Sequence, residues 1–252
     1  MTNLFRKRAL MLAAMLACSI ISVSTASAAF TLSAGQTIRL YDGPGNVNAG
    51  EFILKHQSDG YSAERFRTFC IQTNEFLGLG ETLTIAAIAN FSFSPANSIK
   101  AETSALYREF MRGMAAAGNT VNYMGSILGQ TYYFNSNTAL GITLAGKLQQ
   151  AIWNFQGQGA YANQFVTAAS GLGFAGAAAT TLTGANLQNY GYVQALQLTR
   201  SNGDRGQDQL YWDGRGELTG VPEPTSVALW GTFALGGVLL ARRRRNSAVV
   251  VG

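Results

Sequence analysis

Hydrophobic and polar positions alternate through the first half of the chain's central region, which is the pattern of β-strands. Two strands are predicted at residues 37–41 and 50–55, joined by an Asp-Gly-Pro-Gly turn at residues 42–45. A third strand is expected at residues 66–74, with even-numbered residues on one face and odd-numbered residues on the other. Residues 81–93 continue the β pattern.

After residue 100 the period of the hydrophobic pattern changes from two to about four. Leu106, Phe110 and Met114 recur at four-residue spacing, which predicts one amphipathic helix at residues 101–117. A second helix is expected at residues 141–155.

The rest of the central region predicts a short third helix and then a return to strand. The helix is expected within residues 161–170, and the strands within 189–199 and 207–214. Strands at both ends with helices clustered between them indicate a β-rich α+β fold. No internal repeat is visible in the sequence.

One of two adjacent glutamines on the second helix points into its apolar face. At about 100° of rotation per residue, Gln149 falls between Ala145 and Trp153, whereas Gln150 falls beside Lys147 on the polar side. An amide buried without partners costs on the order of 1 to 3 kcal/mol. We therefore expect Gln149 to have a hydrogen-bonding or a covalent reason for its position.

The first thirty residues have the organisation of a secretory signal peptide. A basic start, Arg6-Lys7-Arg8, is followed by an uncharged apolar run at residues 9–23 and then by Ala26-Ser27-Ala28. Cleavage by signal peptidase is expected between Ala28 and Ala29.

Lipoprotein processing at Cys18 is an alternative, which is weaker because the apolar run continues past that residue. With cleavage after Ala28, Cys18 leaves with the signal peptide and Cys70 is the only cysteine of the mature chain. Exported proteins usually pair their cysteines or lose them, because the compartment oxidises thiols. The solitary Cys70 therefore needs an explanation.

The C-terminal end combines an apolar run with a basic cluster. Residues 225–241 are 17 uncharged, mostly apolar residues, and they are followed by Arg242, Arg243, Arg244 and Arg245. A helix of this length is about as long as a hydrocarbon core is thick, and the arginines can reach cytoplasmic headgroups. We expect this segment to hold the chain at the inner membrane.

A short proline motif, Val221-Pro222-Glu223-Pro224, directly precedes the apolar run. With this motif, residues 221–245 resemble the sorting tail of the PEP-CTERM class of bacterial exported proteins, which has a Pro-Glu-Pro motif, one membrane-spanning segment and a basic cluster. The resemblance implies recognition by an exosortase, removal of the tail near the motif, and delivery to the exterior of a bacterium that makes exopolysaccharide.

The two end segments account for the basic charge of the chain. Its formal net charge is +5, but seven of its 18 Lys and Arg residues lie in these segments. The 11 that remain stand against all 13 Asp and Glu, so residues 29–224 carry a net charge near −2. A nucleic-acid partner is not expected, because it would need a basic face.

Two short motifs, one on an expected strand and one on the second helix, carry a further resemblance. They are Phe69-Cys70-Ile71 and Gln149-Gln150-Ala151-Ile152-Trp153. Together they resemble the thioester domains of bacterial surface adhesins, in which a Cys follows an aromatic or aliphatic residue on a strand and a Gln lies in a Thr-Gln-x-Ala-aliphatic-Trp helix. The resemblance covers residues 52–158, with Leu148 where that family has Thr.

This resemblance implies a single thioester-type β-sandwich or barrel with a helical insertion. It also implies that Cys70 and Gln149 join as an internal thioester with loss of ammonia, which is a stored electrophile. A lysine amine or a hydroxyl on a target would attack this bond once, leaving an amide or ester to Gln149. The flanking side chains would support the site, and the aromatic ones would exclude water: Phe69, Ile71, Ala151, Ile152 and Trp153.

Two plainer interpretations of these residues stay open. Cys70 is also consistent with a small buried hydrophobic residue on a strand. Gln149 is also consistent with an amide that bonds a neighbouring backbone group, and Trp153 with a core residue. The scaffold would then be thioester-like but unreactive.

Other chemistry has little support. His56 is the only histidine, so neither a His-based metal cluster nor a Ser-His-Asp triad is expected, and no cofactor is indicated. Asp204, Asp208 and Asp213 lack calcium-loop spacing, and we interpret residues 201–214 as turn and linker.

The sequence thus predicts five segments. They are a signal peptide (1–28), a thioester-like β-rich domain (29–217), a linker with the proline motif (218–224), a transmembrane sorting helix (225–241) and a basic cytoplasmic tail (242–252). The predicted function is that of an adhesin or matrix-attachment factor, not an enzyme. It would be anchored transiently in the inner membrane and then act at the cell surface or in the extracellular matrix.

The target would be an extracellular protein or polysaccharide. The alternative is a non-covalent structural or carbohydrate-binding component of the extracellular matrix. A hydrolase that uses carboxylates is the least favoured class, because the glutamates, such as Glu64 and Glu75, are scattered and form no identifiable pair.

Overall fold

The computed structural model describes residues 31–46, 49–56, 66–74, 78–93, 97–118 and 120–215. All of these lie within one unit, Ala28–Glu217. The predicted signal peptide with its cleavage site, the Pro-Glu-Pro motif, the sorting helix and the basic cluster lie outside the described residues. Among the residues described, none of the helices has the length and apolar character that a membrane span requires.

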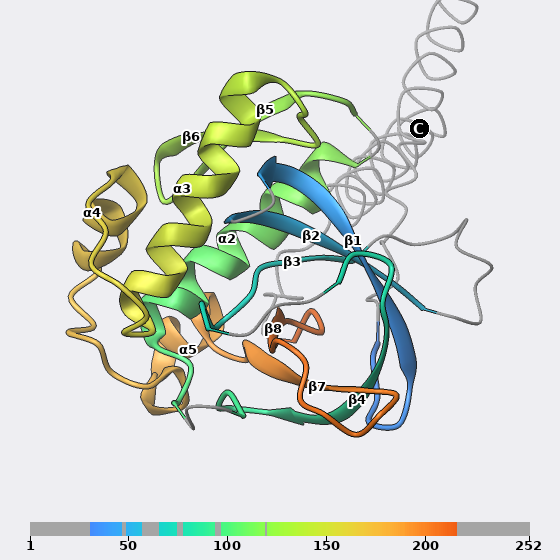
Figure 1. The fold of residues 1–252 in the computed structure, drawn as a ribbon. Coiled ribbons are helices and arrows are strands. Elements are labelled where there is room, and N and C mark those ends of the chain that lie inside the picture. Colours follow the sequence, from blue (N-terminus) through green and yellow to red (C-terminus); the bar gives the residue numbers. More distant parts are fainter. Residues whose placement is uncertain are drawn as a thin grey trace, which may run out of the picture. The chain divides into compact units, whose positions relative to one another are not determined.

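Six antiparallel strands form the main sheet, in the order β3-β2-β1-β4-β7-β8 (Figure 1). Their bounds are β1 (Thr37–Asn46), β2 (Ala49–His56), β3 (Phe66–Thr68), β4 (Thr82–Ala89), β7 (Gln194–Arg200) and β8 (Gln209–Tyr211). A separate hairpin is formed by β5 (Tyr123–Ile127) and β6 (Gln130–Phe134). The β-rich α+β fold expected from the hydrophobic pattern is confirmed.

The two edge strands of the main sheet meet just beyond the end of β3, so the sheet closes on itself. Cys70 forms an antiparallel bridge with Gln209 of β8. The backbone N–H of Ile71 donates to Asp208 at 3.0 Å, and that of Leu210 donates to Phe69 at 3.0 Å. The closure leaves neither β3 nor β8 as an open edge at this point.

The predicted turn at residues 42–45 is wrong. These residues belong to β1, which pairs with β2 from Ile38 opposite His56 to Asn46 opposite Ala49. The register shifts between Asp42 and Gly45, so a bulge takes up the extra residues. Pro44, which has no N–H to donate, is accommodated at that irregularity.

Four α-helices are present in the described residues, with a single 3₁₀ turn at Ala179–Thr181. They are α2 (Ala101–Ala117), α3 (Ala139–Phe155), α4 (Gln164–Ser170) and α5 (Gly184–Tyr190). The three predicted helices are confirmed as α2, α3 and α4. Helix α3 begins two residues earlier than expected, because the Thr138 side chain caps its first turn by accepting from the N–H of Gly141 at 3.2 Å.

Three elements, helix α5 and the two strands of the β5–β6 hairpin, were not predicted from the sequence. Helix α5 has no buried residue, so it lacks the apolar periodicity that would reveal a helix. The β5–β6 hairpin turns through Leu128 and Gly129, both at positive φ. Leucine rarely adopts that conformation. Of the Asn-Gly or Asp-Gly pair that usually marks such a turn in a sequence, only the glycine is present.

The main core lies between the sheet and helices α2 and α3. Helix α3 packs against β1 and β2, with α2 beside it (Figure 1). Phe110 of α2 is the centre of an aromatic cluster, because its ring lies 4.9 Å from Phe69, 5.8 Å from Tyr132 and 5.9 Å from Phe134 between centroids. This packing holds α2 and β6 against Phe69, the residue before Cys70.

Candidate functional site

Cys70 lies at the closure of the sheet with its own backbone polar groups turned away from β8. The two backbone hydrogen bonds to β8 come from its neighbours Ile71 and Phe69, which makes Cys70 and Gln209 a non-hydrogen-bonded pair. On the opposite edge, the ladder between β2 and β3 ends with Phe52 opposite Thr68. The N–H and C=O of Cys70 therefore have no strand partner, and a buried backbone must find another.

The side chain of Gln149 supplies that partner. The backbone N–H of Cys70 donates to Gln149 Oε1 at 3.0 Å, and Gln149 Nε2 donates to the Cys70 carbonyl at 2.8 Å. The thiol of Cys70 also donates to Gln149 Oε1, with Sγ at 3.3 Å. One carboxamide thus takes the place of a neighbouring strand and at the same time contacts the thiol.

The pair is shielded from water. Cys70 is 2% exposed and Gln149 is fully buried. Burial raises the pKa of the Cys70 thiol to about 12, because the charged thiolate is disfavoured in a dry site. The Trp153 indole N–H and the Cys70 backbone N–H oppose this shift but do not outweigh it. At neutral pH the sulfur therefore carries its proton.

Two buried polar atoms near the sulfur lack a hydrogen-bond partner among the described residues. Trp153 Nε1 lies close enough to lower the pKa of Cys70, yet it reaches no acceptor with hydrogen-bonding geometry. Gln209, the bridge partner of Cys70, has an unpartnered Oε1 although it is fully buried. Such groups are rare in folded proteins, and each calls for a reason.

The structure brings part of the predicted site together. Trp153 follows Gln149 by one helical turn, and its ring packs at 6.3 Å from that of Tyr161. The other predicted supporting residues belong to the hydrophobic core and back the site with apolar groups: Phe69, Ile71, Ala151 and Ile152. Leu148, where the adhesin family has Thr, is fully buried in the same core.

The glutamine assignment from the helical pattern is confirmed. Gln149 is fully buried, whereas Gln150 is only partly buried. The expected alternation of faces at residues 66–74 does not extend to burial, because every residue from Phe66 to Gln72 is buried. The closed sheet covers one face of this segment, and the helices cover the other.

Residues 209–211 form β8, as the strand pattern at residues 207–214 predicted, so the interpretation of residues 201–214 as turn and linker is wrong there and at Asp208. Its carboxylate is fully buried and accepts hydrogen bonds from Gln72 Nε2 at 2.9 Å, from the N–H of Leu198 at 3.3 Å and from the N–H of Phe93. In return, Gln72 Oε1 accepts from the N–H of Asp208 at 3.0 Å. This exchange clamps the segment after Cys70 to the segment before Gln209. Nothing in the sequence pattern separates Asp208 from its exposed neighbour Asp204.

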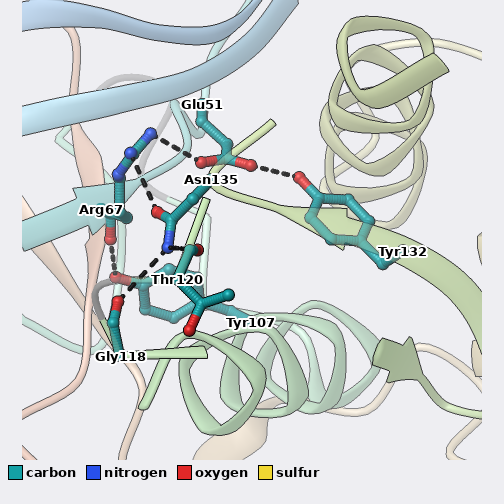
Figure 2. Close-up of polar contacts among 7 residues, drawn as sticks. All are labelled: Glu51, Arg67, Tyr107, Gly118, Thr120, Tyr132 and Asn135. Carbon is teal, nitrogen blue, oxygen red and sulfur yellow. Dashed lines mark hydrogen bonds and ion pairs between the residues drawn. The ribbon is translucent and has the colours of Figure 1, made fainter. Parts of the chain in front are cut away.

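A second buried polar cluster, which we call the Glu51 cluster, joins Glu51 of β2 to Arg67 of β3, three residues before Cys70 in the chain (Figure 2). Glu51 Oε2 accepts from Arg67 at 3.1 Å, and Glu51 Oε1 accepts from the Tyr132 hydroxyl at 2.5 Å. Arg67 also donates to Asn135 at 3.2 Å, and its backbone carbonyl accepts from Tyr107 at 2.9 Å. The sequence pattern did not predict this cluster.

Burial dominates the electrostatics of the Glu51 cluster. It raises the pKa of Glu51 to about 7, although the nearby Arg67 cation and the hydrogen bonds from Tyr132 and Arg67 lower it. No group of three His, Cys, Asp or Glu side chains that could hold a metal ion occurs in the described part of the chain.

Comparison of the chain with protein-family models, curated proteins and solved structures found no match.

Proposed function

We propose that the chain is an exported bacterial surface protein, an adhesin or matrix-attachment factor, that stores an internal thioester between Cys70 and Gln149 and uses it once to bind a target covalently. The observation that carries the proposal is the docking of the Gln149 carboxamide on Cys70, through two backbone hydrogen bonds and the thiol contact. The finer fold assignment, a thioester-type domain, rests on the same observation together with the closed sheet and the helices between its strands.

The contacts suit the chemistry of closure. In this step the Cys70 sulfur bonds to Gln149 Cδ, the bond from Cδ to Nε2 breaks, and the thiol proton goes to the nitrogen, which leaves as ammonia. The Cys70 N–H, at 3.0 Å from Oε1, stabilises the negative charge that develops on that oxygen. The raised pKa of the thiol agrees with a proton that stays in the pair until the nitrogen accepts it.

The same geometry favours amines over hydroxyls as targets. By reversibility, an incoming amine occupies the position from which ammonia leaves, where the Cys70 carbonyl accepts an N–H at 2.8 Å. The new amide keeps this hydrogen bond, but an ester would leave the buried carbonyl unpartnered, at a cost of about 1–3 kcal/mol. We expect methylamine to open the thioester at least about tenfold faster than glycerol at equal concentration, after correction for the intrinsic rates.

Intact mass tests the proposal directly. The purified chain should be lighter than its sequence by one ammonia, and methylamine should bring it to the sequence mass plus one methylene while exposing one thiol. Cys70→Ser and Gln149→Leu should show neither change. A chain at its full sequence mass, with a thiol that titrates after unfolding and no incorporated amine, would rule out the covalent mechanism.

One observation favours a second candidate, a non-covalent matrix component with an unreactive pair. The Gln149 carboxamide already satisfies both backbone groups of Cys70, which is a sufficient structural reason for burying it. This candidate predicts that Cys70→Ser keeps full matrix or carbohydrate binding, whereas the thioester proposal predicts that it abolishes covalent capture.

Export and sorting rest on the sequence motifs alone. We propose removal of residues 1–28 by signal peptidase, transient anchoring through residues 225–241, and release by an exosortase near Val221-Pro222-Glu223-Pro224. Mass spectrometry of the chain secreted by its own host should find an N-terminus at Ala29 and no peptide beyond the proline motif. Retention of the Arg242–Arg245 cluster in the secreted form would contradict the sorting step.

A further inference from the structure

Gln209 occupies the strand position directly opposite Cys70. The two residues form a non-hydrogen-bonded antiparallel pair, flanked by the backbone bonds of Ile71 to Asp208 and of Leu210 to Phe69. In such a pair both side chains lie on the same face of the sheet, with Cβ atoms about 4.5–5.5 Å apart. The Gln209 side chain is therefore a direct neighbour of the Cys70 thiol.

The Gln209 carboxamide has one engaged end and one unengaged end. Gln209 Nε2 donates to the Gln207 carbonyl at 3.4 Å, but Oε1 has no hydrogen-bond donor among the described residues. The side chain is fully buried, so water cannot readily compensate for the missing bond. A hydrogen-bond acceptor of this kind, beside a thiol that has one proton to donate, is unexplained by the packing alone.

Thioester closure creates a need for such an acceptor. In the resting pair the thiol donates to Gln149 Oε1, with Sγ at 3.3 Å. To attack, the sulfur must turn a lone pair toward Gln149 Cδ, and its S–H bond must then point elsewhere. The S–H proton needs a temporary acceptor in this rotamer, since an unpartnered buried donor raises the barrier.

We propose that Gln209 is a positioning residue for closure, whose Oε1 accepts the Cys70 S–H while the sulfur lone pair faces Gln149 Cδ. This inference rests on the proposed thioester function. Gln209 exchanges no atoms: the Sγ–Cδ bond forms, the Cδ–Nε2 bond breaks, and the thiol proton ends on ammonia. After a target amine has opened the bond, the regenerated thiol can again donate to either Gln149 Oε1 or Gln209 Oε1.

The first test detects the hydrogen bond without any thioester. All variants carry Cys18→Ser, so that the infrared S–H stretching band comes from Cys70 only. In Gln149→Met the thiol loses its resting acceptor, and the band should remain at the lower frequency of a hydrogen-bonded thiol because Gln209 accepts it. In the double variant Gln149→Met/Gln209→Met the band should move to the frequency of a thiol without an acceptor.

The second test measures closure itself. Ammonia opens the thioester to the thiol and the original Gln149 carboxamide, and transfer to ammonia-free buffer starts reclosure, followed by intact mass. Gln209→Met should reclose about tenfold more slowly than the parent chain, whereas Gln209→Glu, which keeps an oxygen acceptor, should stay near the parent rate. Gln197→Met is the matched control, because Gln197 is a buried glutamine of β7 whose amide donates to Phe91.

The outcomes separate the inference from the function on which it rests. If Gln149→Met already shows a thiol without an acceptor, the inference fails whatever the thioester does. If Gln209→Met recloses at the parent rate, the inference fails while the thioester stands. If the infrared shift occurs but the parent chain never loses ammonia, the proposed function fails, and with it the positioning role.

Discussion

Two buried polar groups are neighbours in the chain, because Arg67 lies on β3 and Cys70 lies just beyond its end, and they are built in opposite ways. The Glu51 cluster, around Arg67, contains an ion pair whose oxygens and nitrogens reach partners on several elements (Figure 2). The pair at Cys70 is electrically neutral and involves one carboxamide. Nearby, a donor on Trp153 and an acceptor on Gln209 find no partner within the part of the chain that the structure describes.

This difference separates structural from chemical use of buried polarity. In the Glu51 cluster both carboxylate oxygens are engaged and the contacts tie β2, β3 and β6 together, which stabilises the arrangement once it has formed. Around Cys70 a thiol touches an amide, and two further polar atoms are left over. Hydrogen-bonding groups without partners in a site that excludes water lower stability, and a role in reaction chemistry can explain their presence.

The largest expected effect comes from breaking the Glu51 cluster. Arg67→Met leaves Glu51 buried without a cation, and we expect a loss of about 3–5 kcal/mol in the free energy of unfolding at pH 8. The loss should shrink at pH 5, where Glu51 is protonated. Denaturant unfolding measures both values, and Glu51→Gln/Arg67→Met should recover much of the loss. Equal stability of Arg67→Met and the parent at pH 8 would contradict the assigned role.

The pH dependence of the free energy of unfolding should reflect the titration of Glu51 in the same cluster. The pKa of Glu51 is raised from 4.5 to about 7 in the folded chain, so the folded state holds this proton more tightly than the unfolded state does. The resulting stabilisation is fully present below about pH 4.5 and is lost as pH rises through 7, to a total on the order of 3 kcal/mol.

Unfolding titrations between pH 4 and pH 8 measure this slope, and Glu51→Gln should remove most of it. A smaller slope of the same sign should remain, because burial also raises the pKa of Asp208. A parent chain whose stability rises over this range would show that Arg67 outweighs burial.

An intermediate effect is expected at Gln149. Gln149→Leu deprives the Cys70 N–H and C=O of their partners, so the free energy of unfolding should fall by about 1–3 kcal/mol. Gln150→Leu, one residue away on the less buried side of α3, is the matched control and should change stability by less than about 0.5 kcal/mol. Similar values for the two variants would mean that the carboxamide does not replace a strand partner.

The smallest stability effect is expected for Cys70→Ser. A serine hydroxyl can also donate to Gln149 Oε1, so the free energy of unfolding should change by no more than about 1 kcal/mol. Loss of ammonia and amine incorporation should nevertheless disappear completely. Comparison with Gln149→Leu therefore separates the structural role of the carboxamide from the chemical role of the thiol. A large loss of stability in Cys70→Ser would show that the thiol also has a structural role, and the two roles could then not be separated.

The periodic parts of the fold could be predicted from the sequence, and the site only in part. The four-residue spacing around Phe110 predicts α2, and the angular position of Gln149 on its helix predicts that it is the buried one of the two glutamines. Both predictions succeed because burial on a helix follows the 3.6-residue period. The turn expected at Pro44 failed because pairing with β2 continues through it as a bulge. Glu51, Arg67 and Asp208 resemble ordinary surface charges in the sequence, and only the surrounding elements bury them.

By itself, the sequence determined the fold class, the boundaries of α2, the approximate extent of α3, the inward direction of Gln149 and the fact that Cys70 is the only cysteine after Cys18. Those properties depend on local period and on composition. The resemblance of two short motifs predicted that Gln149 would meet Cys70, 79 positions away, but only the tertiary structure decided how the carboxamide contacts Cys70 and that Gln209 lies opposite it. Closure of the sheet, which joins strands far apart in the chain, sets those contacts, and no local pattern encodes it.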